Sequence, residues 1–304
     1  MNKLLFVINP ISGGIEKTNL RNDIEVFCKE NRIIYDIHET TGEDDVNKVS
    51  HSVDHFHAST VVACGGDGTI NMVAQAVISK NIKIAILPLG SANGLATELL
   101  IPNNLQRALE VILSGKTIDM DVVRINKDHI SLHLSDVGFN AKLIKYFEDS
   151  GTRGKVSYAA HFFKVLFKPS AHRYKCICNG SQFRRKAEMV VFANASKYGT
   201  GAVVNPEGSL TDGQFEVCVF KRHPWYGVFR IAFDFFTGRL HNSPYVKIFS
   251  TKRIEVFVDT PVTLQVDGEV IDDFDHILAE LDENKLSVIV PEEYEEKKPP
   301  RQAG

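Results

Sequence analysis

The amino-acid sequence predicts an α/β domain with a parallel sheet, followed by a mainly antiparallel β domain. Up to residue 124, short apolar runs alternate with segments of helical period, which is the pattern of βαβ units. From 125 to 290, apolar and polar residues alternate with a period of two, and turn-forming pairs separate the runs. We therefore divide the 304 residues into domains at 1–124 and 125–290, with a C-terminal tail at 291–304.

The first domain contains four predicted strands, each followed by a polar or glycine-bearing turn. The strands are expected at 4–8, 33–37, 60–63 and 83–87. Helices are expected at 15–30, 43–54, 69–80 and 104–114. Because an open α/β sheet binds its ligand at the carboxyl ends of its strands, the turns that follow these strands are the candidate site.

The second domain contains short strands of alternating pattern, expected at 129–134, 175–178, 188–193, 214–220, 253–258 and 263–266. The pairs Asn179-Gly180, Asp212-Gly213 and Asp267-Gly268 predict tight turns between strands. Two helical inserts are expected, near 155–168 and 224–238.

Composition excludes several classes of protein. The net charge of −3 gives no global positive field, so we expect no nucleic-acid partner. The five cysteines contain no CxxC pair, which indicates a reducing compartment and a cytoplasmic protein. No apolar stretch approaches the roughly 18 to 20 residues that span a bilayer, so any membrane contact would be transient and peripheral. The sequence leaves open whether the protein forms a homodimer.

The sharpest local signal is the segment Gly65-Gly66-Asp67-Gly68-Thr69, which lies between a predicted strand and a predicted helix. Glycines let backbone N–H groups approach a ligand, and a helix N-terminus favours an anion such as phosphate. Because a carboxylate repels phosphate, Asp67 at such a site would have to bind a ribose hydroxyl, a water molecule or a cation such as Mg²⁺. The alternative is a plain turn in which Asp67 caps a helix.

Two more turns of small residues follow the first and fourth predicted strands. Asn9-Pro10-Ile11-Ser12-Gly13 and Gly90-Ser91-Ala92-Asn93-Gly94 offer side chains that can donate to phosphate or ribose oxygens. Neither segment matches the P-loop, and the first strand is not followed by GxGxxG. The sequence therefore supports neither a P-loop NTPase nor an ordinary Rossmann dehydrogenase.

These turns, together with Asn205-Pro206, Leu210-Thr211-Asp212-Gly213 and Asp267-Gly268-Glu269, occur in the order of a known family. The chain resembles the diacylglycerol kinase catalytic-domain family, which includes bacterial soluble lipid kinases and sphingosine kinases and is related in fold to NAD kinases. The resemblance covers almost the whole chain. It implies an NAD kinase-like first domain and an ATP- and Mg²⁺-dependent lipid kinase of phospholipid metabolism, acting on a hydroxyl of diacylglycerol or a similar lipid.

The resemblance also assigns roles to residues. Glu269 would be the general base, with Asp267 beside it in a water and Mg²⁺ network. The metal-binding loop would use Ser209, Asp212 and Gln214. The ATP site would be lined by Asn9, Pro10, Ser12, Gly13, Thr40, Gly65, Gly66, Asp67, Gly68, Thr69, Asn71, Ser91 and Asn93.

One departure from the family pattern concerns Gly94, since family members commonly have Asp there and Thr at the position of Ser91. Asp136 is one candidate to supply the missing charge. Two alternatives to the lipid kinase follow: a catalytically weak nucleotide-binding regulator, which Gly94 favours, and an NAD kinase. The carboxylates at 267 and 269 and the aromatic inserts favour a lipid acceptor over NAD.

Two segments combine basic and aromatic residues. Residues 155–187 contain Lys and Arg but no acid, and residues 221–240 combine basic residues with Trp225 and several Phe. Both would suit an anionic membrane surface that carries the lipid substrate. The alternative is that the aromatic rings belong to the core while the basic heads extend into water.

Overall fold

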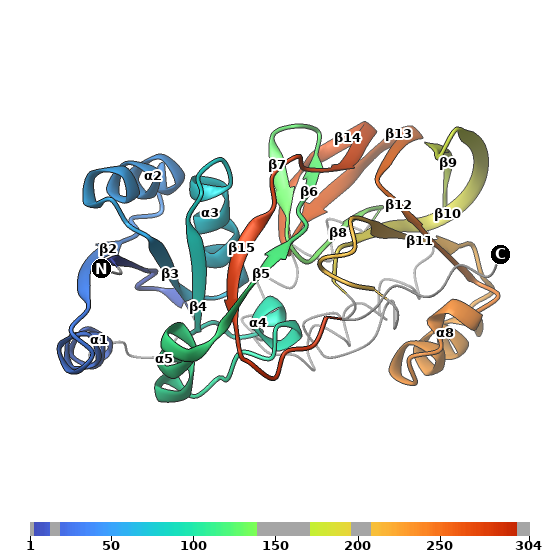
Figure 1. Cartoon of the computed structure of the whole chain (residues 1–304). Helices are drawn as coiled ribbons and strands as arrows, with labels where there is room; N and C mark the ends of the chain where they lie inside the picture. The colour runs from blue at the N-terminus through green and yellow to red at the C-terminus, as the bar shows by residue number, and fades with distance from the viewer. Residues whose placement is uncertain (1–2, 13–18, 139–170, 196–207, 297–304) are drawn as a thin grey trace. The chain divides into compact units, whose positions relative to one another are not determined.

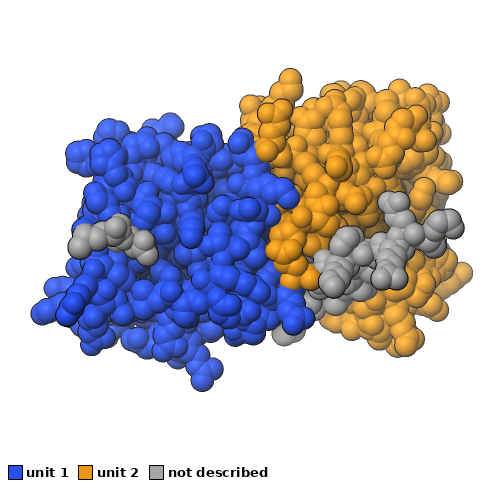
Figure 2. All heavy atoms as spheres, viewed as in Figure 1, with its two compact units in different colours: residues 1–120, 284–295 blue, residues 121–283, 296–304 orange. Residues whose placement is uncertain are grey.

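The computed structural model describes residues 3–12, 19–138, 171–195 and 208–296 (Figure 1). The chain forms two compact units (Figure 2). Unit 1 comprises residues 1–120 and 284–295, and unit 2 comprises residues 121–283 and 296–304. The predicted fold class, a parallel α/β domain followed by an antiparallel β domain, is confirmed.

Unit 1 contains a six-stranded sheet in the order β2-β1-β3-β4-β15-β5. Strands β1 (Lys3–Ile8), β2 (Ile34–Glu39), β3 (Thr60–Gly65) and β4 (Lys83–Pro88) run parallel to one another. Strand β3 is buried along its whole length, as expected of a central parallel strand covered on both faces.

Helices lie on both sides of this sheet, with α2 and α3 on one side and α1 and α5 on the other (Figure 1). Each buries an apolar stripe; in α5 the stripe is Ala108, Leu109 and Ile112. The helices are α1 (Leu20–Glu30), α2 (Asp45–Phe56), α3 (Asp67–Val77), the short α4 (Gly94–Glu98) and α5 (Leu105–Ser114).

The C-terminal part of the chain departs from the predicted domain division. Residues 286–290 were placed with the second domain, but they form β15 (Leu286–Val290) in the sheet of unit 1. Strand β15 pairs parallel with β4 and antiparallel with β5 (Lys116–Met120). Its side chains at 286, 288 and 290 are buried, so this strand closes the hydrophobic core of the first unit.

Unit 2 contains a nine-stranded sheet in the order β12-β11-β10-β8-β13-β14-β6-β7, with β9 paired to β10 and β13. The strand pairings of this sheet are antiparallel throughout the described residues. The strands are β6 (Val123–Ile125), β7 (His129–Ser131), β8 (Leu134–Val137), β9 (His172–Cys178), β10 (Ser181–Ala193), β11 (Phe215–Lys221), β12 (Val246–Thr251), β13 (Arg253–Val266) and β14 (Glu269–Leu281).

The predicted helical insert at 224–238 contains α8 (Gly227–Phe236), whose buried face packs on strands β10 and β11. The insert predicted at 155–168 lies outside the described residues. All five cysteines are buried and reduced. Among the described helices, none is long and apolar enough to cross a bilayer.

Candidate active site

In unit 1, the turns after the parallel strands are joined by hydrogen bonds. The backbone N–H of Asn9, just after β1, donates to the carbonyl oxygen of Cys64 in β3 at 3.2 Å. The Asn9 side chain then donates from Nδ2 to Oγ1 of Thr69 at 3.2 Å. The structure thus brings the Asn9 turn and the glycine turn after β3 together at one edge of the sheet, as predicted.

The glycines at this edge are required by close backbone approach. A Cβ atom on Gly90 would lie 2.4 Å from Cα of Gly66, and a Cβ on Gly65 would lie 2.2 Å from Oγ1 of Thr69. Real Cβ atoms essentially never approach a neighbour this closely. The turns after β3 and β4 therefore pack backbone against backbone.

Asp67 caps a helix, but not the helix that it begins. Its Oδ2 accepts from the N–H of Gly94 at 2.9 Å, and its Oδ1 accepts from the N–H of Leu95 at 3.0 Å. Both donors belong to the first turn of α4, where N–H groups lack partners within the helix. The predicted alternative of a capping carboxylate thus describes the contacts of Asp67, with α4 as the capped helix.

Asn93 holds the turn after β4 in shape. It adopts a left-handed backbone conformation with φ of 51°, and its Oδ1 accepts from the N–H of Gly90 at 2.8 Å. Its Nδ2 donates to the carbonyl oxygen of Pro88 at 3.3 Å. The side chain is buried, so its contacts are those of a residue that shapes the loop.

The other predicted nucleotide-binding residues differ in exposure. Thr40 is buried beside Asn9, and its N–H donates to the carbonyl oxygen of Ile8 at 2.9 Å. Asn71 is buried and accepts from Gln75 at 2.6 Å. Pro10, Gly68 and Ser91 are exposed, Ser12 is half-buried, and Gly13 lies outside the described residues.

In unit 2, Asp267 is the best-bonded carboxylate of the predicted site. Its Oδ1 accepts from the N–H groups of His133 and Leu134 and from the hydroxyl of Ser131, and its Oδ2 accepts from the N–H of Leu132 at 2.7 Å. Asp267 and Gly268 both have positive φ, 47° and 96°, as in the tight two-residue turn of a β-hairpin. Asp267 therefore fixes the β13–β14 turn to the segment 131–134.

Glu269 is the first residue of β14 and is exposed to solvent. Its Cα pairs with Val266, the last residue of β13. Because the turn between them is held by Asp267, the backbone beneath Glu269 is fixed while its carboxylate reaches water. An exposed carboxylate on a fixed backbone can accept a proton from a bound hydroxyl.

The predicted metal-binding loop is held by a carboxylate that the sequence analysis did not select. Oδ2 of Asp121, which is buried, accepts from the N–H of Gly213 at 2.7 Å. Within the loop, Oδ1 of Asp212 accepts from the N–H of Gln214 at 3.0 Å, and Ser209 is buried. The sequence offers one indication of this role, because Asp121 is the only acid in the otherwise apolar run from Met120 to Val123.

This loop suits Mg²⁺ by its chemistry, since one or two carboxylates with water and substrate oxygens are the usual ligands of that ion. Among the described residues, no group of three or more His, Cys, Asp or Glu side chains could hold a metal. The ion would therefore depend on Asp212, backbone oxygens and substrate oxygens.

Asn194 connects the metal loop to the hairpin turn within unit 2. Its Nδ2 donates to the carbonyl oxygen of Asp121 at 2.7 Å and to that of Leu132 at 3.1 Å. Asp121 contacts the 209–214 loop, and the Leu132 N–H donates to Asp267. The candidate metal loop and the turn that carries Glu269 are thus linked by one buried amide, which no sequence pattern had indicated.

Asp136 does not supply the negative charge that the family pattern places at the position of Gly94. It is buried on β8, and its Oδ1 has no hydrogen-bond partner among the described residues. Burial raises the pKa of Asp136 to about 8, so its carboxyl is mostly protonated at neutral pH. A protonated carboxyl supplies no negative charge.

Comparison with known proteins agrees with this architecture. The model of the diacylglycerol kinase catalytic domain matches residues 3–125, and that of the YegS C-terminal NAD kinase beta sandwich-like domain matches residues 134–290. A relative from Enterobacter sp. (strain 638), named "Probable lipid kinase YegS-like", is 26% identical over 275 residues, covering 87% of this chain and 88% of the relative.

Solved structures share the fold. A diacylglycerol kinase from Bacillus anthracis str. Sterne superimposes with a TM-score of 0.73 at 19% identity, over 96% of this chain and 97% of that one. An NAD kinase from Archaeoglobus fulgidus in complex with ATP gives 0.53 at 16% identity, over 95% and 94%. With both domain models matched in order, the chain belongs to the lipid kinase-like family that joins a diacylglycerol kinase catalytic domain to a YegS C-terminal domain.

Proposed function

We propose that this protein is an ATP-dependent kinase that phosphorylates a hydroxyl of diacylglycerol or a similar lipid. The observation that carries the proposal is the Asp267 turn, which fixes the backbone beneath the exposed Glu269 and is linked through Asn194 to the 209–214 loop. The family supports a kinase, and phosphoryl transfer needs mainly alignment, cations and a base.

The residues of unit 1 would hold ATP. The turn after β3 leads directly into α3, and the N-terminus of that helix favours the negative charge of phosphate oxygens. Asn9 and Thr69, which are hydrogen-bonded to each other, would shape the same surface.

The residues of unit 2 would serve the acceptor and the metal. Ser209, Asp212 and Gln214 would hold Mg²⁺, which supplies positive charge to neutralise phosphate oxygens. Glu269 would take the proton from the lipid hydroxyl as that oxygen forms its bond to the γ-phosphorus and the bond to the ADP oxygen breaks. Such general-base help is worth roughly 10²- to 10⁴-fold in rate.

The test is Glu269→Gln, assayed with γ-labelled ATP and a panel of lipids in mixed micelles. We expect label in one lipid with the unaltered protein, a 10²- to 10⁴-fold loss of turnover in the variant, and unchanged ATP affinity. Glu283→Gln is the matched control, because Glu283 is an exposed glutamate in the same unit, and it should leave turnover unchanged. Full turnover in Glu269→Gln would refute the role of the base.

Gly94 favours one other function, a nucleotide-binding regulator with little catalysis. That reading predicts ATP binding by the unaltered protein and by Glu269→Gln, with no lipid labelled by either. Adding NAD to the same assay tests whether the protein is an NAD kinase. If NAD is labelled and no lipid is, the acceptor is NAD and the proposal of a lipid acceptor is wrong.

We also propose that α8 brings the protein to the membrane that carries its substrate. Arg222, Arg230 and Arg239 accompany the aromatic rings of this segment. Rings at exposed positions beside cations suit an anionic lipid surface. The rings are Trp225, Tyr226, Phe229, Phe233 and Phe236, each more than half exposed, with Trp225 at 71%.

The variant Phe229→Ser/Phe233→Ser tests this membrane contact by co-sedimentation with lipid vesicles. We expect weaker sedimentation with vesicles of any composition, because apolar burial provides the binding. If the unaltered protein instead forms a dimer that this variant abolishes, while vesicle binding is unchanged, α8 is a contact between two copies of the chain.

A further inference from the structure

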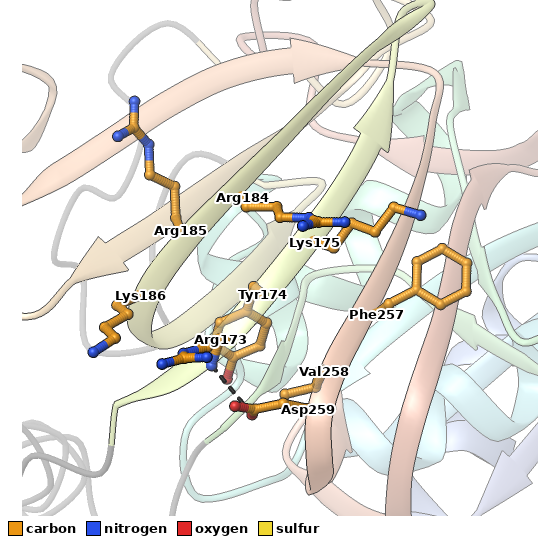
Figure 3. Close-up of a pocket in the computed structure, with 9 residues that line it drawn as sticks. All are labelled: Arg173, Tyr174, Lys175, Arg184, Arg185, Lys186, Phe257, Val258 and Asp259. Carbon is orange, nitrogen blue, oxygen red and sulfur yellow. Dashed lines mark hydrogen bonds between the residues drawn. The ribbon is translucent and has the colours of Figure 1, made fainter.

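A basic pocket of about 470 Å³ lies in unit 2, and its lining includes none of the residues assigned to catalysis (Figure 3). Strands β9, β10 and β13 form it. Its volume is within the range of small-molecule sites. It is lined by Arg173, Tyr174, Lys175, Arg184, Arg185, Lys186, Phe257, Val258 and Asp259.

The strand register places like charges directly opposite one another. Arg184 of β10 pairs with Lys175 of β9, and Lys186 pairs with Arg173. Arg184 and Lys175 lie side by side in Figure 3. Like charges opposite each other destabilise a strand pair. Because neighbouring strands lie only about 4.8 Å apart, these cations can also contact one ligand together.

No carboxylate of the described residues neutralises this cluster. None of the five cations lining the pocket forms a salt bridge with a described residue, whereas Arg21, Lys80 and Arg253 on other surfaces each have an acidic partner. The single acid of the pocket, Asp259, accepts from the backbone N–H of Arg173 at 3.2 Å. The pocket thus holds an excess of positive charge in a protein whose net charge is −3.

One wall of the pocket is apolar and fixed. The ring of Phe257 stacks on the ring of His276, with centroids 4.4 Å apart. The Nζ of Lys175 lies 5.2 Å from the centroid of the Phe257 ring and makes a cation–π contact with it. This contact orients the Lys175 ammonium without neutralising it. An apolar wall beside several cations suits a ligand that joins a phosphate to a less polar body.

We infer that this pocket binds the phosphate group of an anionic phospholipid headgroup. Guanidinium and ammonium groups are the usual partners of phosphate, and the planar fork of Arg matches its oxygens. The choice of a phospholipid over free phosphate rests on the proposed lipid kinase function. The pocket would give preference for anionic membranes, while α8 would supply apolar binding to any membrane.

The experiment compares binding to vesicles of phosphatidylcholine alone and to vesicles that also contain phosphatidylglycerol, without ATP. The variant is Lys175→Gln/Arg184→Gln. We expect about 30-fold weaker binding to the anionic vesicles, and unchanged binding to phosphatidylcholine, because each basic residue near an anionic surface strengthens binding about fivefold. The control, Lys29→Gln/Arg107→Gln, removes two exposed cations from α1 and α5 and should bind like the unaltered protein. Equal binding by variant and control would overturn the inference.

A second arm distinguishes the source of the phosphate. Inorganic phosphate and glycerol 3-phosphate at millimolar concentration should not displace the protein from anionic vesicles. If either soluble anion binds and the binding is lost in Lys175→Gln/Arg184→Gln, while anionic vesicles show no preference, the ligand is a free phosphate and the phospholipid assignment is wrong.

Two further variants separate charge, folding and catalysis. Lys175→Arg/Arg184→Lys keeps both charges and should keep the preference for anionic vesicles; loss of it in a folded protein would contradict a charge-based site. Glu269→Gln should bind anionic vesicles like the unaltered protein. If binding to anionic vesicles depends on the pocket cations but no lipid is ever phosphorylated, the proposed function fails and the anion site stands.

Discussion

The carboxylate of Asp67 accepts the backbone N–H of Gly94 at 2.9 Å, so one side chain joins the glycine turn after β3 to the start of α4. The family resemblance implies Asp at the position of Gly94. In this chain, a second carboxylate there would be next to Asp67. The glycine therefore suits the capping contact that the structure shows.

Asp67→Asn should loosen this junction. The amide offers one acceptor oxygen in place of two, so the N–H of either Gly94 or Leu95 loses its partner. We expect a loss of about 1–2 kcal/mol in the free energy of unfolding, measured with urea, together with weaker ATP binding in a titration. Asp128→Asn, at an exposed site, is the control. Unchanged stability and ATP affinity in Asp67→Asn would show that the cap does not hold the turn.

Gly90→Ala should separate the turns after β3 and β4. The new Cβ would lie 2.4 Å from Cα of Gly66, so one backbone must shift. Overpacking of this kind costs about 1–3 kcal/mol, which a thermal unfolding curve would detect as a lower Tm. Ser91→Ala changes the exposed neighbouring residue and should leave Tm unchanged. A Gly90→Ala protein with the original Tm would mean that the two turns can separate without cost.

Asp267→Asn should lower turnover although Asp267 is assigned no contact with the reacting atoms. Three backbone N–H groups and one hydroxyl donate to its carboxylate, and an amide cannot accept them all. We expect a lower kcat with little change in KM for ATP, because Glu269 is displaced and the nucleotide-binding turns are not. Asp275→Asn, an exposed carboxylate on β14, should leave kcat unchanged. A change confined to KM for ATP would argue against a positioning role.

Asp136→Asn should change how stability depends on pH. Burial raises the pKa of Asp136 from 3.8 in the unfolded chain to about 8 in the folded protein. Between these values the unfolded chain releases a proton that the folded protein keeps, so this group's contribution is full below pH about 4 and is lost as the pH rises to about 8. The Asn variant has no such loss.

Urea unfolding at pH 5 and at pH 8 measures this effect. The stability of Asp136→Asn relative to the unaltered protein should rise between the two pH values, by an amount on the order of several kcal/mol. Asp128→Asn, at an exposed site, provides the control. Parallel profiles for Asp136→Asn and the unaltered protein would mean that the carboxyl titrates equally in both states.

The local parts of the fold follow from short-range pattern. Helix α5 was expected at 104–114 and is observed at 105–114, because its apolar stripe and the Asn104 cap are encoded within a few residues. The Asp267-Gly268 turn follows in the same way, since both residues tolerate positive φ. The glycine turns at 65–68 and 90–94 were placed at strand ends for the same reason.

Long-range pairing decided the rest. Strand β15 joins the sheet of unit 1 by pairing with β4 and β5, which lie about 200 and 170 residues earlier in the chain, and no local pattern encodes a pairing over that distance. The roles of Asp121 and Asn194 come from contacts between distant segments, as does the pairing of Arg184 with Lys175. By itself, the sequence determined the types of the elements and the residues at their turns, because dihedral preferences and hydrophobic period act over a few residues. Only the tertiary structure decided which carboxylates are held by backbone N–H groups, which reach solvent and which are buried and neutral, because those properties depend on neighbours brought together by folding.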